Sequence, residues 1–468
     1  MLFNSLDFLC LLAPTFLLYY LPFMRRLQLH LIITASFIFY AYSEPWLLTL
    51  LVISICINIV ASYGAVHGAA GRRKLYATLG VVVNLSILLF FKYSPLFGRS
   101  FFSGTELGAF LVSIPLPIGI SFFTFQGISL AVDAYRGRDL PEYKSIIVKN
   151  IWQHSLRSAA FKSFFPQLVA GPVVKAKDFL PQIATKYFSK VDWEKAIGAL
   201  VVGYFLKMVI ADNMSEQTFW LTYPYFKGLS SITLIALLFG YSMQIFADFA
   251  GYSLIAIGLG HLFGYTLMTN FNFPYLSRSF SEFWKRWHIS LSSFLREYLY
   301  IPLGGNRKGP VRTYTNLMLT MVLGGLWHGA AWSYAVWGAF HGVLLAVERL
   351  LQDRFGGPFK LPRLVSTLFV FTCVTLAWLL FKLPNFEHVI AYVQALAGNW
   401  TSGDLQPLII FFIGLLSIPV VVYHLFHSGN EDKARTRRAA WRPYAYGIML
   451  FLLLTNSGSG SAFIYFQF

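Results

Sequence analysis

Charge is the first thing this chain lacks. Only 12% of its 468 residues are Asp, Glu, Lys or Arg, whereas 56% are hydrophobic. A soluble protein of this length needs far more charge to cover its surface. Apolar stretches of about 18 residues or more, long enough to cross a bilayer, recur from end to end. The composition therefore excludes a soluble globular protein and predicts an all-α polytopic membrane protein.

Acidic residues are scarcer than basic ones. The chain has 20 Asp and Glu against 37 Lys and Arg, which gives a net charge of +17. The basic residues stand in short clusters between apolar runs, a pattern typical of the orientation signals of membrane proteins. No basic tail or stacking platform indicates nucleic-acid binding. We therefore expect contacts with membrane lipids and no nucleic-acid partner.

Cysteine is rare too, and the common metal and hydrolase motifs are missing. Cys10, Cys56 and Cys373 lie in apolar runs and form no CxxC pair, so they indicate neither a disulfide nor a zinc site. The chain has no HExxH and no GxSxG motif, and "GLGHLFG" does not match GxGxxG. These absences argue against a metal site, a serine hydrolase and a nucleotide-binding fold. We expect no bound metal or cofactor.

What the sequence does hold is a series of apolar segments that predict membrane-spanning helices. The predicted spans whose limits can be placed are residues 5–23, 29–42, 46–65, 75–92 and 107–132, with a last span at about 443–455. The first segment lacks a preceding basic region, so we expect a retained helix and not a signal peptide.

Basic clusters give these spans an orientation. They follow the first, third and fifth predicted spans, the last of these clusters being Arg136 and Arg138. That alternation favours cytoplasmic loops at these places and an N-terminus outside the cytoplasm. The basic stretch 432–442 predicts one more cytoplasmic loop, which puts the C-terminus outside as well. Both ends outside require an even number of crossings, and we expect roughly ten, give or take about two.

The middle of the chain contains a segment of a different kind. Residues 163–183, "SFFPQLVAGPVVKAKDFLPQI", mix aromatic side chains with Pro166, Gly171 and Pro172. Non-helical backbone at membrane depth is tolerated where it is buried in protein or lines a wet cavity. The segment predicts a re-entrant stretch or short half-helices, with an ordinary surface loop as the alternative.

A second unusual segment, residues 282–300, interleaves aromatic and basic side chains. This pattern predicts one amphipathic helix at the membrane interface. Ser279 or Ser281 can cap its start, and Glu282 can pair with Arg286 one turn later. Glycines 304 and 305 should end it. No repeat or linker interrupts the chain, so we expect a single membrane domain over residues 1–468.

Histidines at membrane depth are the candidates for chemistry. The run from Thr315 to Val347 contains no charged residue but holds His328 and His341, and His288 precedes it in "FWKRWHISLS". An ionisable side chain in such surroundings is a functional hypothesis by default, because burying it is costly. For each histidine alone, a hydrogen bond to a backbone carbonyl of another helix is the structural alternative. A neutral imidazole is the general base that acyl transfer to a hydroxyl requires.

The motifs around these histidines resemble the membrane-bound O-acyltransferases, and most closely the branch of bacterial alginate O-acetyltransferases. The resemblance rests on "FFPQLVAGPV", "DFAGYSLIAIGLG", "FWKRWHISLS", "YIPLGGNR" and "GGLWHGA", and it is dense from about residue 115 to 350. It implies a ring of tilted transmembrane helices around a central funnel, with re-entrant and interfacial helices.

The resemblance also implies roles for residues. His328 of the "WHG" motif would be the catalytic histidine, and His288 of "RWHIS" the second active-site residue. Lys285 and Arg286 suit the phosphates of an acyl donor. The remaining supporting or donor-binding residues taken from these motifs are Asn306 and Trp327.

For function, the resemblance implies an O-acetyltransferase of the bacterial inner membrane. It would pass acetyl groups from a cytoplasmic thioester, acetyl-CoA or another acetyl thioester, across the membrane to an exopolysaccharide such as alginate or cellulose of a biofilm. A periplasmic hydrolase-like acetyltransferase and a polysaccharide secretion complex are the partners that it implies. A basic stretch before "FFPQ" departs from the alginate type and leaves the acceptor and the partner open. D-alanylation of teichoic acid is a related reaction, and a transporter or flippase and a non-catalytic scaffold are the alternatives from other classes.

Overall fold

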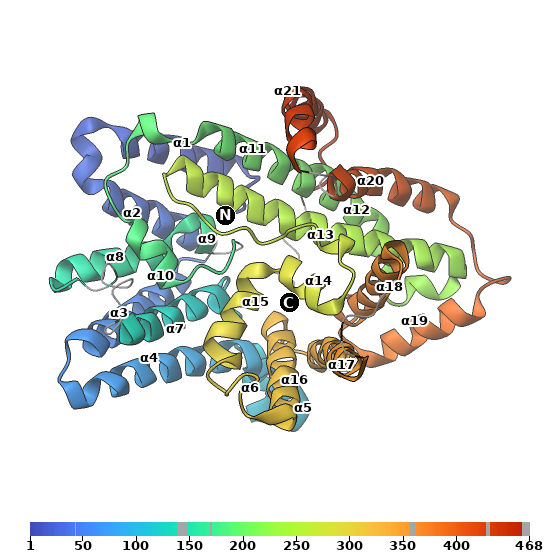
Figure 1. Cartoon of the computed structure of the whole chain (residues 1–468), viewed down its shortest axis with the longest axis horizontal. Coiled ribbons are helices and arrows are strands. Elements are labelled where there is room, and N and C mark those ends of the chain that lie inside the picture. Colours follow the sequence, from blue (N-terminus) through green and yellow to red (C-terminus); the bar gives the residue numbers. More distant parts are fainter. Residues whose placement is uncertain are drawn as a thin grey trace. The chain divides into compact units, whose positions relative to one another are not determined.

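The regular elements of this protein are helices. The computed structural model describes residues 1–42, 44–137, 146, 148–168, 171–355, 357, 361–426 and 431–460, and for residues 426 and 431–440 it describes only the backbone. Over this part of the chain all helices are α, 3₁₀ or π, and the one strand-like contact is an isolated bridge between Leu229 and Asp404. The all-α prediction is confirmed (Figure 1).

The described chain divides into two compact units. One comprises Met1–Leu200 with Ser253–Met268, and the other Val201–Tyr252 with Thr269–Phe468. The long helix α13 (Ser231–Leu262) begins in the second unit and ends in the first. The sequence predicts one membrane domain and gives no sign of this division, because no linker or change of composition marks its limits.

Seven helical segments of the described residues are long and apolar enough to cross a membrane, or up to eight if a bent pair is one span. They are Leu47–His67, Ala70–Phe101, Trp193–Leu221, Ser231–Leu262, Trp332–Phe355, Arg363–Lys382 and Pro407–Leu425. A polytopic membrane protein is thereby confirmed. Eight lies at the lower edge of the predicted range, and it is the even number that two termini on one side require.

Two of the predicted spans are a single bent pair. Helix α1 (Leu6–Tyr20) has 15 residues and α2 (Gln28–Ala41) has 14, and the chain bends by 104° between them. Pro22 explains the break, because proline has no amide hydrogen to continue a helix and suits the first position of the next one. The pair is a broken span or a re-entrant loop, and the prediction of two full spans here is wrong.

The predicted spans 107–132 and 443–455 are also placed differently. Two helices replace the first: α6 (Glu106–Ser113) and α7 (Ile120–Gly137), separated by a stretch that holds Pro115 and Pro117. The second lies within α21 (Glu431–Thr455), so the basic stretch predicted as a loop is helical backbone. Lys, Arg and Ala favour a helix, which the loop prediction underweighted. Arg138 lies outside the described residues.

Three helices of the first unit pack side by side: α3 (Leu47–His67), α4 (Arg73–Leu88) and α7 (Figure 1). Between them the amides of Asn58 and Asn84 exchange hydrogen bonds of 2.8 and 3.2 Å and are 1% exposed. Gly127 of α7 faces this pair so closely that a Cβ at that position would lie 2.7 Å from Asn58 Nδ2 and still closer to Asn84 Oδ1. Small residues allow such close packing of membrane helices around polar contacts.

Replacing Gly127 with alanine should therefore destabilise the protein. The added methyl group must displace one of the two amides, and overpacking of this kind costs about 1–3 kcal/mol. The measurement is the thermal midpoint of the detergent-purified protein. Gly414→Ala is the matched control, because nothing lies within 4 Å of a Cβ at that helical position. An equal midpoint for both variants would show that the amide pair has room to move.

The described residues of the segment 163–183 include short helices, as one of the two predicted alternatives has it. They are α9 (Phe165–Leu168), α10 (Ala176–Phe179) and a 3₁₀ turn over Leu180–Gln182. Side chains from other helices satisfy its free backbone amides: Ser36 accepts from Phe165, and Ser129 from Ala176, both at 3.1 Å. These bonds explain how irregular backbone is buried in an apolar protein, since each unpaired amide would be costly.

Candidate active site

The predicted amphipathic helix 282–300 is broken at His288. Helix α14 covers Phe280–Arg286, α15 covers Ile289–Leu295, and a π-helical turn follows over Arg296–Tyr300. His288 has a φ of 44°, a left-handed conformation that is uncommon outside glycine. A backbone in this conformation turns the chain between α14 and α15, so the prediction of one continuous helix is wrong.

The start and end of this region are as predicted. The Ser279 hydroxyl accepts the backbone N–H of Glu282 at 3.0 Å, and Glu282 pairs with Arg286 at 2.8 Å. Both glycines that follow have positive φ, 112° at Gly304 and 55° at Gly305. Glu348 adds an anchor that the sequence does not reveal, because its carboxylate accepts the backbone N–H of Phe280 at 2.6 Å. A carboxylate at this end of a helix is favourable.

Asn270 determines the orientation and the tautomer of His288. Its Oδ1 accepts the backbone N–H of Ser290 at 3.2 Å and the Ser290 hydroxyl at 2.8 Å, which identifies this atom as the oxygen. His288 Nδ1 lies 3.1 Å from the same oxygen. Because a carbonyl oxygen cannot donate, Nδ1 must carry the proton, and Nε2 is left as the accepting nitrogen of the ring.

Burial keeps this imidazole neutral. The side chain of His288 is 0% exposed. Burial disfavours the charged form and lowers the pKa of His288 to about 3. The ring of Phe249 stands edge-on to it at 4.5 Å. At neutral pH the ring is therefore an uncharged hydrogen-bonding group with a defined acceptor atom.

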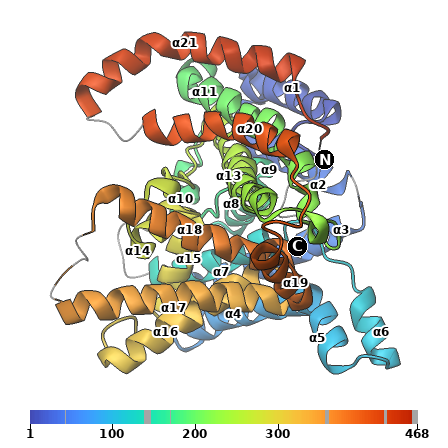
Figure 2. The same ribbon diagram turned by 90° about the vertical axis from the view of Figure 1, so that its right-hand side faces the viewer.

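His328 lies at the C-terminal end of α16 (Gly309–His328), which packs against α17 (Trp332–Phe355) (Figure 2). Gly325 and Gly338 face each other across the two helices, where a Cβ on Gly325 would lie 3.0 Å from the Gly338 backbone. Gly325, one helical turn before His328, thus allows close helix packing.

The two motif histidines come together within the second unit. Their ring centroids are 6.1 Å apart. Trp327 lies beside both, 5.9 Å from His288 and 5.1 Å from His328, and is 4% exposed. The two histidines are 40 residues apart in the sequence, and the path of α15 and α16 brings them together.

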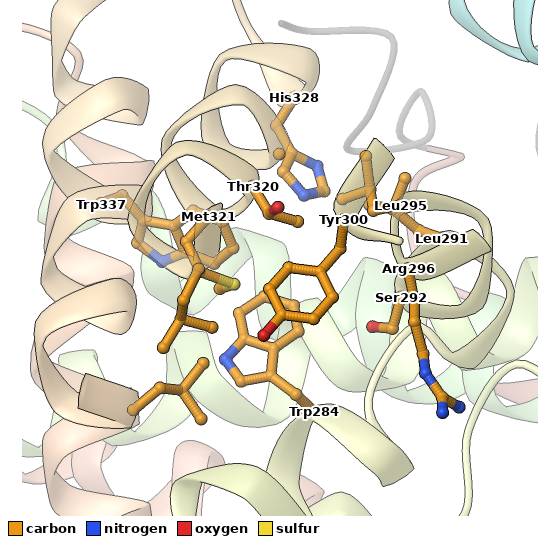
Figure 3. Close-up of a pocket in the computed structure, with 13 residues that line it drawn as sticks. Trp284, Leu291, Ser292, Leu295, Arg296, Tyr300, Thr320, Met321, His328 and Trp337 are labelled. Carbon is orange, nitrogen blue, oxygen red and sulfur yellow. The ribbon is translucent and has the colours of Figure 1, made fainter. Parts of the chain in front are cut away.

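His328 lines a cavity of about 210 Å³ (Figure 3). Most of its walls are apolar. The lining residues are Trp284, Leu291, Ser292, Leu295, Arg296, Tyr300, Leu317, Thr320, Met321, Gly324, His328, Trp337 and Leu345. In the view of Figure 3, Trp284 and Trp337 lie on the wall opposite Ser292 and Arg296. Such a cavity suits a mostly apolar ligand group with a negative charge near Arg296.

The other predicted site residues lie outside the lining of this cavity. Lys285 is exposed, and Arg286 is held by Glu282 and by the carbonyl of Asn272 at 3.2 Å. Asn306 is exposed in the turn after the two glycines. The cation that does line the cavity is Arg296, ten residues after Arg286.

Sequence reasoning missed Arg296, Trp284 and Trp337 as site residues. The signal was available in part, because Leu291, Leu295 and Arg296 share one face of a helix that begins at Ile289. In a single helix from 282 to 300 these side chains would point in a different direction relative to Lys285 and Arg286. The break at His288 is therefore needed to predict which residues face the cavity.

His341 does not make the hydrogen bond to a backbone carbonyl that was its structural alternative. It is 0% exposed, and neither ring nitrogen has a hydrogen-bond partner among the described residues. Instead the rings of Trp337 and Trp284 stand 4.8 and 5.2 Å from it. A bond to a backbone carbonyl is therefore the wrong account of this residue, which packs between the two indoles.

Two buried histidines predict how stability varies with pH. The pKa of His288 is lowered to about 3, and in the first unit burial, aided by His67 and Arg157, lowers the pKa of His154 to about 4. Unfolded histidine binds a proton near pH 6.5. The unfolded state then binds more protons than the folded one below that pH, so stability is lost as the pH falls from 6.5, by up to about 1.4 kcal/mol per unit for each ring.

The measurement is the thermal midpoint of the purified protein between pH 6.5 and 5, a range in which ordinary carboxylates stay ionised. His154→Gln should flatten the slope, because the variant has one fewer group to protonate on unfolding. An unchanged slope in this variant would contradict the assignment.

Comparison with known proteins gives a family and three relatives. The model of "MBOAT, membrane-bound O-acyltransferase family" matches residues 116–356. The probable alginate O-acetylase of Azotobacter vinelandii is 40% identical over 422 residues, which cover 87% of this chain and 80% of that protein. The corresponding protein of Pseudomonas aeruginosa is 40% identical over 425 residues, 87% of this chain and 77% of the relative. The peptidoglycan O-acetyltransferase of Helicobacter pylori is 35% identical over 428 residues, 85% and 80% of the two chains.

Proposed function

The chain belongs to the membrane-bound O-acyltransferase family, and from this we propose that it transfers acetyl groups from a thioester donor to hydroxyl groups of a bacterial polysaccharide. The prediction of an acyltransferase is thereby confirmed at the level of the family. The observation that carries the acetyl-transfer proposal is His328 in the wall of an apolar cavity, 6.1 Å from a second imidazole that is neutral and fixed in its tautomer.

In the proposed reaction His328 acts as the general base. The acceptor hydroxyl oxygen attacks the thioester carbonyl carbon, and the hydroxyl proton passes to His328. The new carbon–oxygen bond forms while the carbonyl electrons move onto its oxygen. As the intermediate collapses, the carbon–sulfur bond breaks and the thiolate takes the proton back from His328. His288, through Nε2, accepts a hydrogen bond from the acceptor hydroxyl and orients it.

We assign the donor to the thioester class, acetyl-CoA or another acetyl thioester that enters from the cytoplasm. The acetyl group of such a donor is small and apolar, and most of the cavity lining is apolar too. Arg296 lines the cavity and is itself exposed, so it can meet a phosphate of the donor. Lys285 and Arg286 lie one helix earlier and supply further positive charge toward the same ligand.

Replacing Arg296 with glutamine should raise the KM for acetyl-CoA and leave kcat nearly unchanged. Removing one charge-assisted contact of an exposed arginine corresponds to about five- to tenfold, or roughly 1–1.5 kcal/mol. Initial rates at varied acetyl-CoA concentration measure it. Arg312→Gln is the matched control, since Arg312 is an exposed arginine of α16 that does not line the cavity. Equal effects of the two variants would remove Arg296 from the donor site.

The acceptor in our proposal is a glycan hydroxyl on the far side of the bacterial inner membrane. Relatives are named for alginate and for peptidoglycan, and cellulose is the further candidate. A periplasmic hydrolase-like acetyltransferase and a polysaccharide secretion complex complete the proposed assembly. A transporter or flippase, or a non-catalytic scaffold of that complex, are the competing functions.

The test uses membranes from cells that carry the full chain, with acetyl-CoA labelled in its acetyl group and de-acetylated polymannuronate, cellulose or peptidoglycan as acceptors. Transfer should give polymer-bound label that hydroxylamine releases, as it does from esters. Label that crosses the membrane without becoming bound to polymer would indicate transport. Polymer acetylation that persists in cells with His328→Ala would indicate a scaffold.

A further inference from the structure

Two tryptophans in the cavity wall carry unused hydrogen-bond donors. Trp337 is 1% exposed, and its Nε1 has no hydrogen-bond partner among the described residues. Trp284 lines the same cavity, and its Nε1 is likewise buried without a partner in the described chain. Leaving a buried donor unpaired is costly, and unpaired groups in native proteins call for an explanation.

One indole stands close to the proposed base, and the other stands next to the first. The ring of Trp337 is 5.3 Å from that of His328 and nearly perpendicular to it, at 87°. The ring centroid of Trp284 lies 5.8 Å from that of Trp337. Figure 3 shows His328 at the top of the view, Trp337 at the left, Trp284 at the bottom and Arg296 at the right.

His341 holds the two indoles in place. Its ring contacts both of them, at 4.8 Å from Trp337 and 5.2 Å from Trp284, and it stands one helical turn after Trp337 on α17. On its other side it stacks on Phe283 at 6.2 Å, with an angle of 6° between the planes. This packing restricts the motion of both indoles before any ligand arrives.

We propose that the Nε1–H groups of Trp337 and Trp284 donate hydrogen bonds to the carbonyl oxygen of the acyl donor. The proposal rests on the acyl transfer proposed above. When the hydroxyl oxygen adds to the carbonyl carbon and its proton goes to His328, the carbonyl electron pair becomes a full negative charge on this oxygen. The two indoles stabilise that charge until the carbonyl re-forms and the thiolate leaves. His341 is a positioning residue that acts through both indoles.

Indoles suit this task for a chemical reason. The indole N–H is a donor only, so it cannot take the proton that His328 must hold. The walls are apolar, and a preorganised donor aimed at developing charge is worth more in such surroundings than in water. Each donor would act in the transition state far more than in the ground state, because the charge exists only there.

The decisive variant is the full chain with Trp337 replaced by 3-benzothienylalanine, which keeps the shape of the indole and has sulfur in place of N–H. We expect kcat for label transfer from acetyl-CoA to fall by roughly 10²–10³-fold. The KM for acetyl-CoA should rise by no more than about tenfold, the loss of one ground-state hydrogen bond. Trp337→Phe should behave similarly. Trp378→Phe is the control: it removes a buried indole that stacks on Trp337 at 5.6 Å but does not line the cavity.

A binding measurement separates this role from a structural one. Acetonyl-CoA, a ketone, keeps the carbonyl oxygen, whereas S-ethyl-CoA lacks it. The benzothienylalanine variant should bind acetonyl-CoA several-fold more weakly, about two- to tenfold for one lost hydrogen bond. Its affinity for S-ethyl-CoA should be unchanged.

Full kcat in the benzothienylalanine variant, or an equal loss of affinity for both analogues, would overturn the assignment of the indoles. The proposed function would survive that result, because wild-type transfer and its dependence on His328 are measured in the same membranes. Absence of transfer by the wild-type chain would instead reject the acyl transfer itself.

Discussion

Replacing His328 with alanine is expected to lower the rate of polymer acetylation by roughly 10²–10⁴-fold, the usual contribution of a general base. The side chain is 4% exposed and lines the cavity, so its removal deletes the imidazole of the cavity lining, which is the proposed base. The measurement is polymer-bound acetate formed per amount of purified chain. The yield and thermal midpoint should stay close to wild type, because the cavity beside the ring can absorb the loss of its volume.

Two controls distinguish loss of chemistry from loss of structure. His30→Ala makes the same change at an exposed position and should leave acetylation unchanged. His328→Gln keeps most of the volume and polarity but cannot accept and return a proton, so it should be as inactive as the alanine variant. Near-normal acetate in either His328 variant would remove His328 from the mechanism.

Replacing Lys207 with methionine is expected to have the largest effect on stability, about 3–5 kcal/mol. Lys207 Nζ lies 2.7 Å from Asp212 Oδ1 and 2.8 Å from Asp248 Oδ1, and the side chains are 1%, 1% and 5% exposed. Without the ammonium, two buried carboxylates would face each other with no compensating charge. The expected result is a severe drop in the yield of folded protein and in its thermal midpoint.

The matched comparisons for Lys207 are an exposed pair and a neutral triple variant. Lys195→Met breaks a bridge of similar length, 2.8 Å, at side chains 68% and 42% exposed, and should leave the thermal midpoint close to wild type because water screens this pair. The triple variant Lys207→Met, Asp212→Asn and Asp248→Asn removes all three charges and should recover much of the loss. A stable Lys207→Met protein would mean that water or other groups solvate the carboxylates.

Much of the architecture could be predicted from the sequence because hydropathy and charge report it directly. The apolar segment ending at His67 and the proline-rich stretch after Ser163 are found close to where the patterns predict them. The cap at Ser279 and the pair between Glu282 and Arg286 are local interactions, so spacing alone identifies them.

What could not be predicted depends on backbone geometry and on contacts between distant residues. The 104° bend at Pro22 turns two predicted spans into one bent pair. A hydropathy pattern gives no information about the angle between two helices. The left-handed backbone of His288 has no sequence signal, since nothing about a histidine favours it. That one residue determines which face of the next helix meets the cavity, and therefore why Arg296 lines it and Lys285 does not.

The candidate histidines themselves were predictable, and their arrangement was not. His288 and His328 stand out as imidazoles in apolar surroundings, which sequence reveals. Their separation of 6.1 Å is a product of the fold. So is the contact with the oxygen of Asn270, which determines which nitrogen of His288 carries the proton. The role of the two indoles depends on an unpaired donor, which is visible only once every partner is placed.

The central claim is that His328 and His288 act together on one reacting hydroxyl and carbonyl. A double-mutant cycle measures this directly, as kcat/KM for transfer of labelled acetyl by the wild type, His328→Ala, His288→Ala and the double variant. Residues that act as one unit are grossly non-additive, so the double variant should be about as slow as the slower single variant. If the two losses multiply instead, the histidines contribute independently, and the account of a shared site is wrong.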